Sequence, residues 1–196
     1  MPFSERTVFR SFLMLVCLTS VCWLAASNAS AQSEVSETGV VETLSEYPIP
    51  SQTIVLPVSV TDAWAAFTTS EGYSSWAAPF AVVDLRVNGT IEASYAENAV
   101  AGDPANIVIS IPAYLPERLL VMKTIQAPPG FATPELLDRL VSIVEFEAVG
   151  PSRTRITLSA VGYTDEDEEM RTGFLRANAW VLGQLHAYLT GDTASE

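Results

Sequence analysis

Apolar side chains recur along residues 165–189 with the spacing of one helix face. At about 100° per residue, one stripe of the helix contains Met170, Phe174, Val181, Leu185 and Tyr188. Leu182 and Leu189 lie on the flank of this stripe. Asn178 is a polar residue inside this stripe. The pattern predicts one long amphipathic helix, which needs a hydrophobic surface to lie on.

Most of the preceding chain has the pattern of strands. Stretches of strand-like composition between turn residues cover residues 53–58, 80–87, 90–95, 106–111, 118–126, 141–148 and 154–163. Short helical stretches cover residues 60–69, 71–76 and 133–139. Between the second and third strands, Asn88-Gly89 predicts a two-residue hairpin, because both positions tolerate a positive φ. The order predicts an α+β domain in which strands supply the surface for the final helix.

The last two strands define a register. Four pairs fit it, namely the inner pairs Phe146–Ile156 and Val144–Leu158 and the outer pairs Glu147–Arg155 and Glu145–Thr157. A slip of one residue would bury both glutamates. We therefore interpret the two glutamates as solvated charges and not as a catalytic pair.

An acidic run at residues 165–169 begins the long helix. Carboxylates in a first turn face the positive end of the helix dipole, and Asp165 and Glu168 have the spacing of a capping box. A calcium loop would need a glycine and alternating ligands, which this run lacks. Capping accounts for the acidic run without a metal.

The N-terminus has the pattern of a secretory signal peptide. Arg6 and Arg10 flank the start of an apolar run over residues 12–26, and Ala29-Ser30-Ala31 forms a small-x-small cleavage site. The alternative is an uncleaved anchor, but the run is shorter than the about 20 residues of a membrane span. We expect cleavage, no stable membrane anchor afterwards, and a periplasmic or secreted protein.

Processing would leave a folded domain with acidic flanks. We expect residues 1–31 to be the signal, 32–52 a flexible acidic leader, 53–190 the domain and 191–196 a tail. Both cysteines lie in the signal, so the mature chain would depend on its core and not on disulfides. Loss of Glu5, Arg6 and Arg10 leaves 8 basic and 22 acidic side chains, a formal charge of −14. Such a surface argues against nucleic-acid and membrane-surface partners.

Four segments resemble a known family. Residues 53–64, TIVLPVSVTDAW, look like the opening of the START-like (SRPBCC) superfamily. Residues 76–80 (WAAPF) and 83–89 (VDLRVNG), and Ala179-Trp180 near the end, are similar to the domain related to the activator of the Hsp90 ATPase. The resemblance implies a helix-grip fold, in which a curved antiparallel sheet of about six to seven strands surrounds the long C-terminal helix and leaves a cavity between them.

The chain departs from that family in two respects. The family usually has a Gly-Gly pair where this chain has Asn88-Gly89. The family is also mostly cytosolic, whereas this chain has an export signal, so co-chaperone activity is not carried over to it.

The expected cavity has candidate lining residues. Aromatic, flexible or isolated polar side chains near its mouth are Trp76, Phe80, Tyr95, Tyr114, Met122, Phe174, Asn178 and Val181. The alternative for each is plain core packing. The buried amide of Asn178 needs a partner, which a ligand, a water or a backbone carbonyl could provide.

The residue inventory limits the possible chemistry. The mature chain has no cysteine, and its single histidine, His186, falls off the apolar stripe, so a zinc site and a Cys/His nucleophile are not expected. Asp84 and Arg86 read as an exposed ion pair of little energetic weight. No cofactor is implied.

Three functions follow from this reading. The leading hypothesis is a non-enzymatic protein that binds a small apolar or amphipathic molecule between sheet and helix. The first alternative is a cyclase- or dehydratase-like enzyme, which would require Tyr95, Tyr114 or Asn178 to converge. The second is a protein-interaction module that uses the sheet or the acidic leader.

Overall fold

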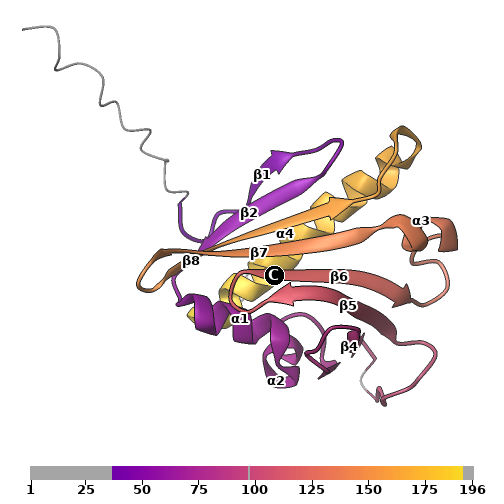
Figure 1. Ribbon diagram of the computed structural model, residues 1–196, viewed down its shortest axis with the longest axis horizontal. Helices are drawn as coiled ribbons and strands as arrows, with labels where there is room; N and C mark the ends of the chain where they lie inside the picture. Colours follow the sequence, from indigo (N-terminus) through magenta and orange to yellow (C-terminus); the bar gives the residue numbers. More distant parts are fainter. Residues whose placement is uncertain (1–36, 97, 192–196) are drawn as a thin grey trace, which may run out of the picture. The chain divides into compact units, whose positions relative to one another are not determined.

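The computed structural model describes residues 37–96 and 98–191. The predicted signal peptide, the start of the leader and the end of the tail lie outside these residues. The described chain is α+β, with one curved, unclosed antiparallel sheet and a long C-terminal helix on one face (Figure 1). The strands are β1 (Glu42–Ser45), β2 (Ser51–Leu56), β3 (Phe80–Val83), β4 (Gly89–Ser94), β5 (Ile107–Leu115), β6 (Leu119–Gln126), β7 (Val141–Gly150) and β8 (Arg153–Val161). The helices are α1 (Val60–Thr68), α2 (Ser70–Ser74), α3 (Pro134–Arg139) and α4 (Glu168–Thr190), with a 3₁₀ turn at Asp165–Asp167.

The strand order in the sheet is β1-β2-β8-β7-β6-β5-β4-β3, and the neighbouring strands pair antiparallel. The predicted register of the last hairpin is confirmed, because Phe146 pairs with Ile156 and Glu147 with Arg155. Val144, Phe146 and Ile156 are buried, and Glu145 and Glu147 are exposed. Alternation along one strand therefore fixed which face of β7 meets the core.

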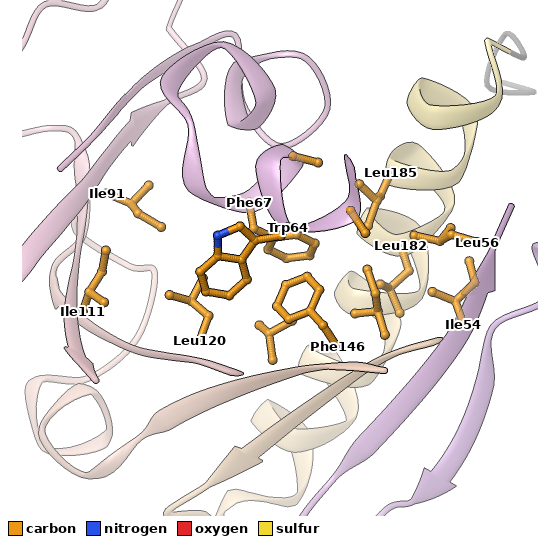
Figure 2. Packing of buried hydrophobic residues seen from close by; sticks show 14 residues of the cluster. Ile54, Leu56, Trp64, Phe67, Ile91, Ile111, Leu120, Phe146, Leu182 and Leu185 are labelled. Carbon is orange, nitrogen blue, oxygen red and sulfur yellow. The ribbon is translucent and has the colours of Figure 1, made fainter. Parts of the chain in front are cut away.

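The core lies between the sheet, α1 and α4. At its centre the ring of Phe146 stands 5.2 Å from Trp64 and 5.3 Å from Phe67, centroid to centroid. Figure 2 shows these three rings flanked by Leu182 and Leu185 of α4. These two leucines are fully buried, so they fix the C-terminal half of α4 on the sheet.

The expected flexible leader, residues 32–52, needs correction in its second half. Residues 42–45 form β1, which pairs with β2 through Glu42–Thr53 and Thr43–Gln52. The backbone N–H of Gly39 also donates to the carbonyl of Val55 at 2.8 Å. Polar side chains on a short edge strand leave no hydrophobic alternation, so the sequence alone did not reveal β1. Because of β1 the sheet has eight strands, more than the resemblance implied.

The expected two-residue hairpin at Asn88-Gly89 is wrong. The connection from β3 to β4 spans residues 84–88 and is closed by an N–H···O bond of 2.8 Å from Gly89 to Arg86. Asn88 has the expected positive φ of 61°, but Gly89 does not. Glycine is needed at position 89 because a Cβ there would lie 2.0 Å from the carbonyl oxygen of Asp84. The predicted pair of Asp84 and Arg86 forms within this loop, at 2.7 Å and exposed.

Two further boundaries differ from prediction. Strand β5 continues through Pro112 to Leu115, because Pro112 falls in an irregular stretch of β5–β6 pairing where no ladder N–H is required. The predicted capping box also lies one residue earlier than Asp165 and Glu168 suggested and belongs to the 3₁₀ turn before α4, since the backbone N–H of Thr164 donates to Oδ2 of Asp167 at 2.7 Å.

Asp167 also joins α4 to α3. The guanidinium of Arg139 donates to both of its oxygens, at 2.7 and 2.9 Å, and to the carbonyl of Gly162 at 2.7 Å. The hydrogen bonds from Arg139, and then those from Thr164, lower the pKa of Asp167 below its usual range. One ion pair therefore connects the end of α3, the end of β8 and the start of α4.

We expect Asp167→Asn to lower the melting temperature at pH 7 and to matter less in acid. A carboxyl whose pKa is lowered by folding stabilises the native state above its ordinary pKa, near 3.8 for Asp167, and loses that contribution as the pH falls toward the folded value. In thermal melts of wild type and variant between about pH 2 and pH 7, the difference in melting temperature should shrink steadily below about pH 4. A gap that stays constant through this range would contradict the argument. The exposed Glu169→Gln serves as control.

Candidate functional site

A pocket of about 410 Å³ lies between the N-terminal half of α4, α3 and the sheet. A smaller hollow of about 130 Å³ adjoins it toward the core and shares six of its lining residues, which are Tyr73, Trp76, Ser142, Phe174, Asn178 and Val181. Further walls come from Ile107, Ile109 and Thr124 of the sheet and from Leu136 of α3. The lining is mainly apolar and aromatic.

Small residues on α4 leave this space open. Gly173 and Ala177 both face the pocket, and a Cβ added to Gly173 would meet no heavy atom within 4 Å. The predicted apolar stripe is therefore buried only in part, since Met170 stays 39% exposed while Leu185 is fully buried. Near the other end of the helix, Tyr188 is 41% exposed, which the stripe did not predict. The helix is fixed at Leu182 and Leu185 and covers a hollow toward its N-terminus.

The structure gathers most of the sequence-predicted residues around this space. The larger pocket is lined by Trp76, Tyr95, Phe174, Asn178 and Val181, and the inner hollow adds Met122. Phe80 and Tyr114 line neither. Phe80 begins the edge strand β3, and Tyr114 packs toward Trp64 with ring centroids 6.3 Å apart.

Sequence reasoning missed several wall residues. The missed set includes Tyr73 of α2, Leu136 and Leu137 of α3, Ser142 of β7 and Tyr163 after β8. Apolar spacing in 134–140 gave a signal for a short helix, with Thr133 as its cap. Nothing in that spacing says that this helix lines a pocket, because other walls of the pocket come from Tyr163 and α4, far along the chain.

Charge is absent from the lining of both hollows. None of their lining side chains is Asp, Glu, Lys, Arg or His. Burial, with a smaller effect of Tyr95, raises the pKa of Tyr73, and burial together with Asp167 raises the pKa of Tyr163 to about 12. Both phenols are therefore neutral at physiological pH. The described walls therefore offer neutral hydrogen-bonding groups.

Two polar groups of the lining contrast with each other. The indole N–H of Trp76 donates to the carbonyl of Ala66 at 2.9 Å and is satisfied within the protein. The Nδ2 of Asn178 is buried and has no hydrogen-bond partner in the described structure. The backbone carbonyl expected as one possible partner is thus not supplied by the described chain.

Residues 57–190 match the family described as activator of Hsp90 ATPase homolog 1-like protein. The chain belongs to that family. The match covers more than half of the chain and includes β3 to β8 and the whole of α4. The START-like fold that the sequence resemblance implied is thereby confirmed, and this Hsp90-activator-like chain carries a helix-grip sheet and helix.

Solved structures share the fold of this Hsp90-activator-like chain. A protein from Arthrobacter aurescens has a TM-score of 0.60 and 17% identity over 80% of this chain and 95% of its own. Protein SSP2350 from Staphylococcus saprophyticus has a TM-score of 0.59 and 14% identity over 76% and 96%. The Aha1 dimer from Colwellia psychrerythraea has a TM-score of 0.56 and 14% identity over 74% and 98%. No curated protein matches the sequence. At these identities the structural likeness shows the fold alone.

Among the described residues of this Hsp90-activator-like chain, Tyr95, Tyr114 and Asn178 do not converge on one point. Tyr95 is 62% exposed at the rim, and Tyr114 is outside both hollows. Within residues 37–96 and 98–191, no three His, Cys, Asp or Glu side chains gather as a metal site would require. In the same residues, no helix has both the length and the hydropathy to span a membrane.

Proposed function

We propose that this chain is an exported binding protein that holds one small apolar or amphipathic molecule in the pocket beneath α4. The observation that carries the proposal is the uncharged pocket of about 410 Å³ with its adjoining hollow. Small-molecule sites are concave, mostly apolar and fitted with a few polar groups. Transfer of an apolar molecule from water to such walls is favourable at about 25 cal/mol per Å² of buried apolar surface.

Export forms part of the proposal. It is supported by the apolar run and the Ala29-Ser30-Ala31 site in the sequence, which lie outside the described residues. A binding protein in the periplasm or medium needs no energy source or cofactor to carry a poorly soluble molecule. N-terminal sequencing of the mature protein should begin at Gln32.

The enzyme alternative has less support. The lining groups are hydroxyls, an amide and neutral phenols, and the pKa of both buried tyrosines is raised away from neutrality. Proton transfer at pH 7 needs a group whose pKa lies near 7. A binding role makes no such demand on the walls.

The interaction alternative follows from the family description, which names an activator of the Hsp90 ATPase. Deletion of residues 32–50, as a test of the acidic leader, would also remove β1 and leave the edge of β2 unpaired. Charge-reversing substitutions on the leader are a better test, because they leave β1 in place.

We expect protein purified from its own host to carry a noncovalent small molecule. Native mass spectrometry would detect it as an added mass that is lost on denaturation. After delipidation, a ligand at about 100 times its Kd should stabilise the fold by about 2.7 kcal/mol, which corresponds to about 8 °C in Tm. A ligand-free spectrum, together with no thermal shift across a panel of lipids and aromatic compounds, would contradict the proposal.

A further inference from the structure

The deep end of the pocket contains uncharged polar groups. Asn178 of α4 and Ser142 of β7 line both the pocket and the inner hollow. Ser142 pairs with Ala160, so it lies on the face of β7 that carries the buried Val144 and Phe146. A ligand that enters below α4 and reaches the hollow would meet these two side chains.

The amide nitrogen of Asn178 is buried without a hydrogen-bond partner in the described structure. Asn178 lies about one helical turn after Phe174 and one before Val181, and all three line both hollows. A buried unpaired amide destabilises a fold, whereas an apolar side chain of the same size would not. Rotation about the last torsion of the side chain is soft, so either amide atom can turn toward the hollow. A group that enters the pocket can then give the amide the partner that the protein lacks.

The charge of the walls restricts what that group can be. A carboxylate or ammonium brought into either hollow would meet no side chain of opposite charge. Desolvation of an unpaired ion costs far more than desolvation of a neutral polar group. The chain as a whole is acidic, with a formal charge of −13, which further disfavours an anion.

We propose that the pocket selects uncharged, largely apolar molecules that carry a hydroxyl or carbonyl oxygen, and that Asn178 is the residue that binds this oxygen. This inference rests on the proposed function, because it assigns the ligand class of the same pocket. It goes beyond that function by separating neutral alcohols and ketones from fatty acids and from cationic amphiphiles.

A matched ligand set tests the selection. Naphthalene, naphthol, acetylnaphthalene, naphthoate and naphthylmethylammonium share one skeleton, and decanol, decanal, decanoate and decylammonium share another. Calorimetric titration at pH 7 should give the tightest binding for the alcohol and the carbonyl compound, with at least about tenfold weaker binding for either ion. If no compound of either skeleton binds, charged or uncharged, the proposed function fails. If the ions bind as tightly as the alcohols, the selection alone is overturned.

The variant Asn178→Leu separates a ligand-binding amide from a structural one. Because the amide nitrogen is unpaired, we expect the ligand-free variant to melt about 3 °C higher than wild type. Its affinity for naphthol and acetylnaphthalene should fall about tenfold, while its affinity for naphthalene is unchanged. A lower melting temperature with an equal loss for all three ligands would overturn the inference.

Gln184→Leu is the matched control. Gln184 is another amide on α4, and it lines neither hollow. Its replacement should leave the order of the ligands unchanged. If Gln184→Leu removed the preference for naphthol over naphthalene as Asn178→Leu does, the effect would belong to the helix and not to the pocket.

Discussion

Gly173→Phe should lower the affinity of the pocket for its ligand by about 100-fold, or about 2.7 kcal/mol, without unfolding the protein. Gly173 lines the pocket, and the space around an added Cβ is empty to 4 Å, so the new ring has room to enter. The ring would then occupy volume that a ligand needs. Replacement of a glycine inside a helix also stabilises that helix by about 0.5 kcal/mol. Titration of the delipidated variant with the ligand found by mass spectrometry measures the loss.

Gly183→Phe provides the comparison. Gly183 lies on the same helix, also has no atom within 4 Å of an added Cβ, and lines neither hollow. Both variants change helix propensity by the same amount, so the difference between them is whether the new ring lies in the pocket. Binding that survives in Gly183→Phe and disappears in Gly173→Phe places the ligand beneath α4. Equal binding by the two variants would mean that the ligand sits elsewhere.

Hydrophobic periodicity predicted those elements for which only one placement buries the apolar side chains and leaves the charged ones in solvent. The 3.6-residue pattern located α4 to within a few residues, and alternation in β7 and β8 gave the observed pairing. In that hairpin a wrong register would bury Glu145 or Glu147, so hydrophobic burial and charge solvation exclude the alternatives together. Local sequence is sufficient to predict the pairing of a hairpin where one face must be buried and the other must be in solvent.

The pattern failed where pairing partners are distant or the surface is polar. Strand β1 has no buried apolar side chain of its own and exists because β2 offers an unpaired edge. The loop before Gly89 is shaped by a bond from the N–H of Asn88 to the carbonyl of Ile111, which no hairpin rule contains. These features depend on tertiary contacts and not on local propensity.

The site residues on α4 were predictable from the sequence, and those on other elements were less so. Phe174, Asn178 and Val181 follow from the helical stripe, which had to face the sheet. Tyr114 was misplaced because Ile107 and Ile109, near the start of β5, line the pocket, whereas Tyr114 near its end packs toward Trp64 of α1. The volume of the pocket is left open by small residues such as Gly173 and Ala177. A pattern of apolar positions does not show where side chains are too small to fill the space.

Phe146→Ala should destabilise the fold by about 4 kcal/mol and lower Tm by about 12 °C. The ring is 5% exposed and packs edge-on against both Trp64 and Phe67 of α1, so its removal leaves a cavity between α1 and the sheet (Figure 2). Phe67 and Trp64 are each held by a further ring, since Phe67 packs on Trp76 with centroids 4.8 Å apart and Trp64 on Tyr114 with centroids 6.3 Å apart, so we expect little collapse into the space. Urea unfolding followed by tryptophan fluorescence would measure the loss.

Glu145→Ala is the control one position away. Glu145 lies on the same strand, pairs with Thr157 and faces solvent, so we expect a change within about 0.5 kcal/mol. If both substitutions lowered the free energy of unfolding by a similar amount, β7 would not have one buried and one solvated face. The register would then be wrong. Since Phe67 and Trp76 connect this core to the hollow below α4, a slipped β7 would also remove Ser142 and Val144 from its wall. The pocket depends on the same alternation that buries Phe146.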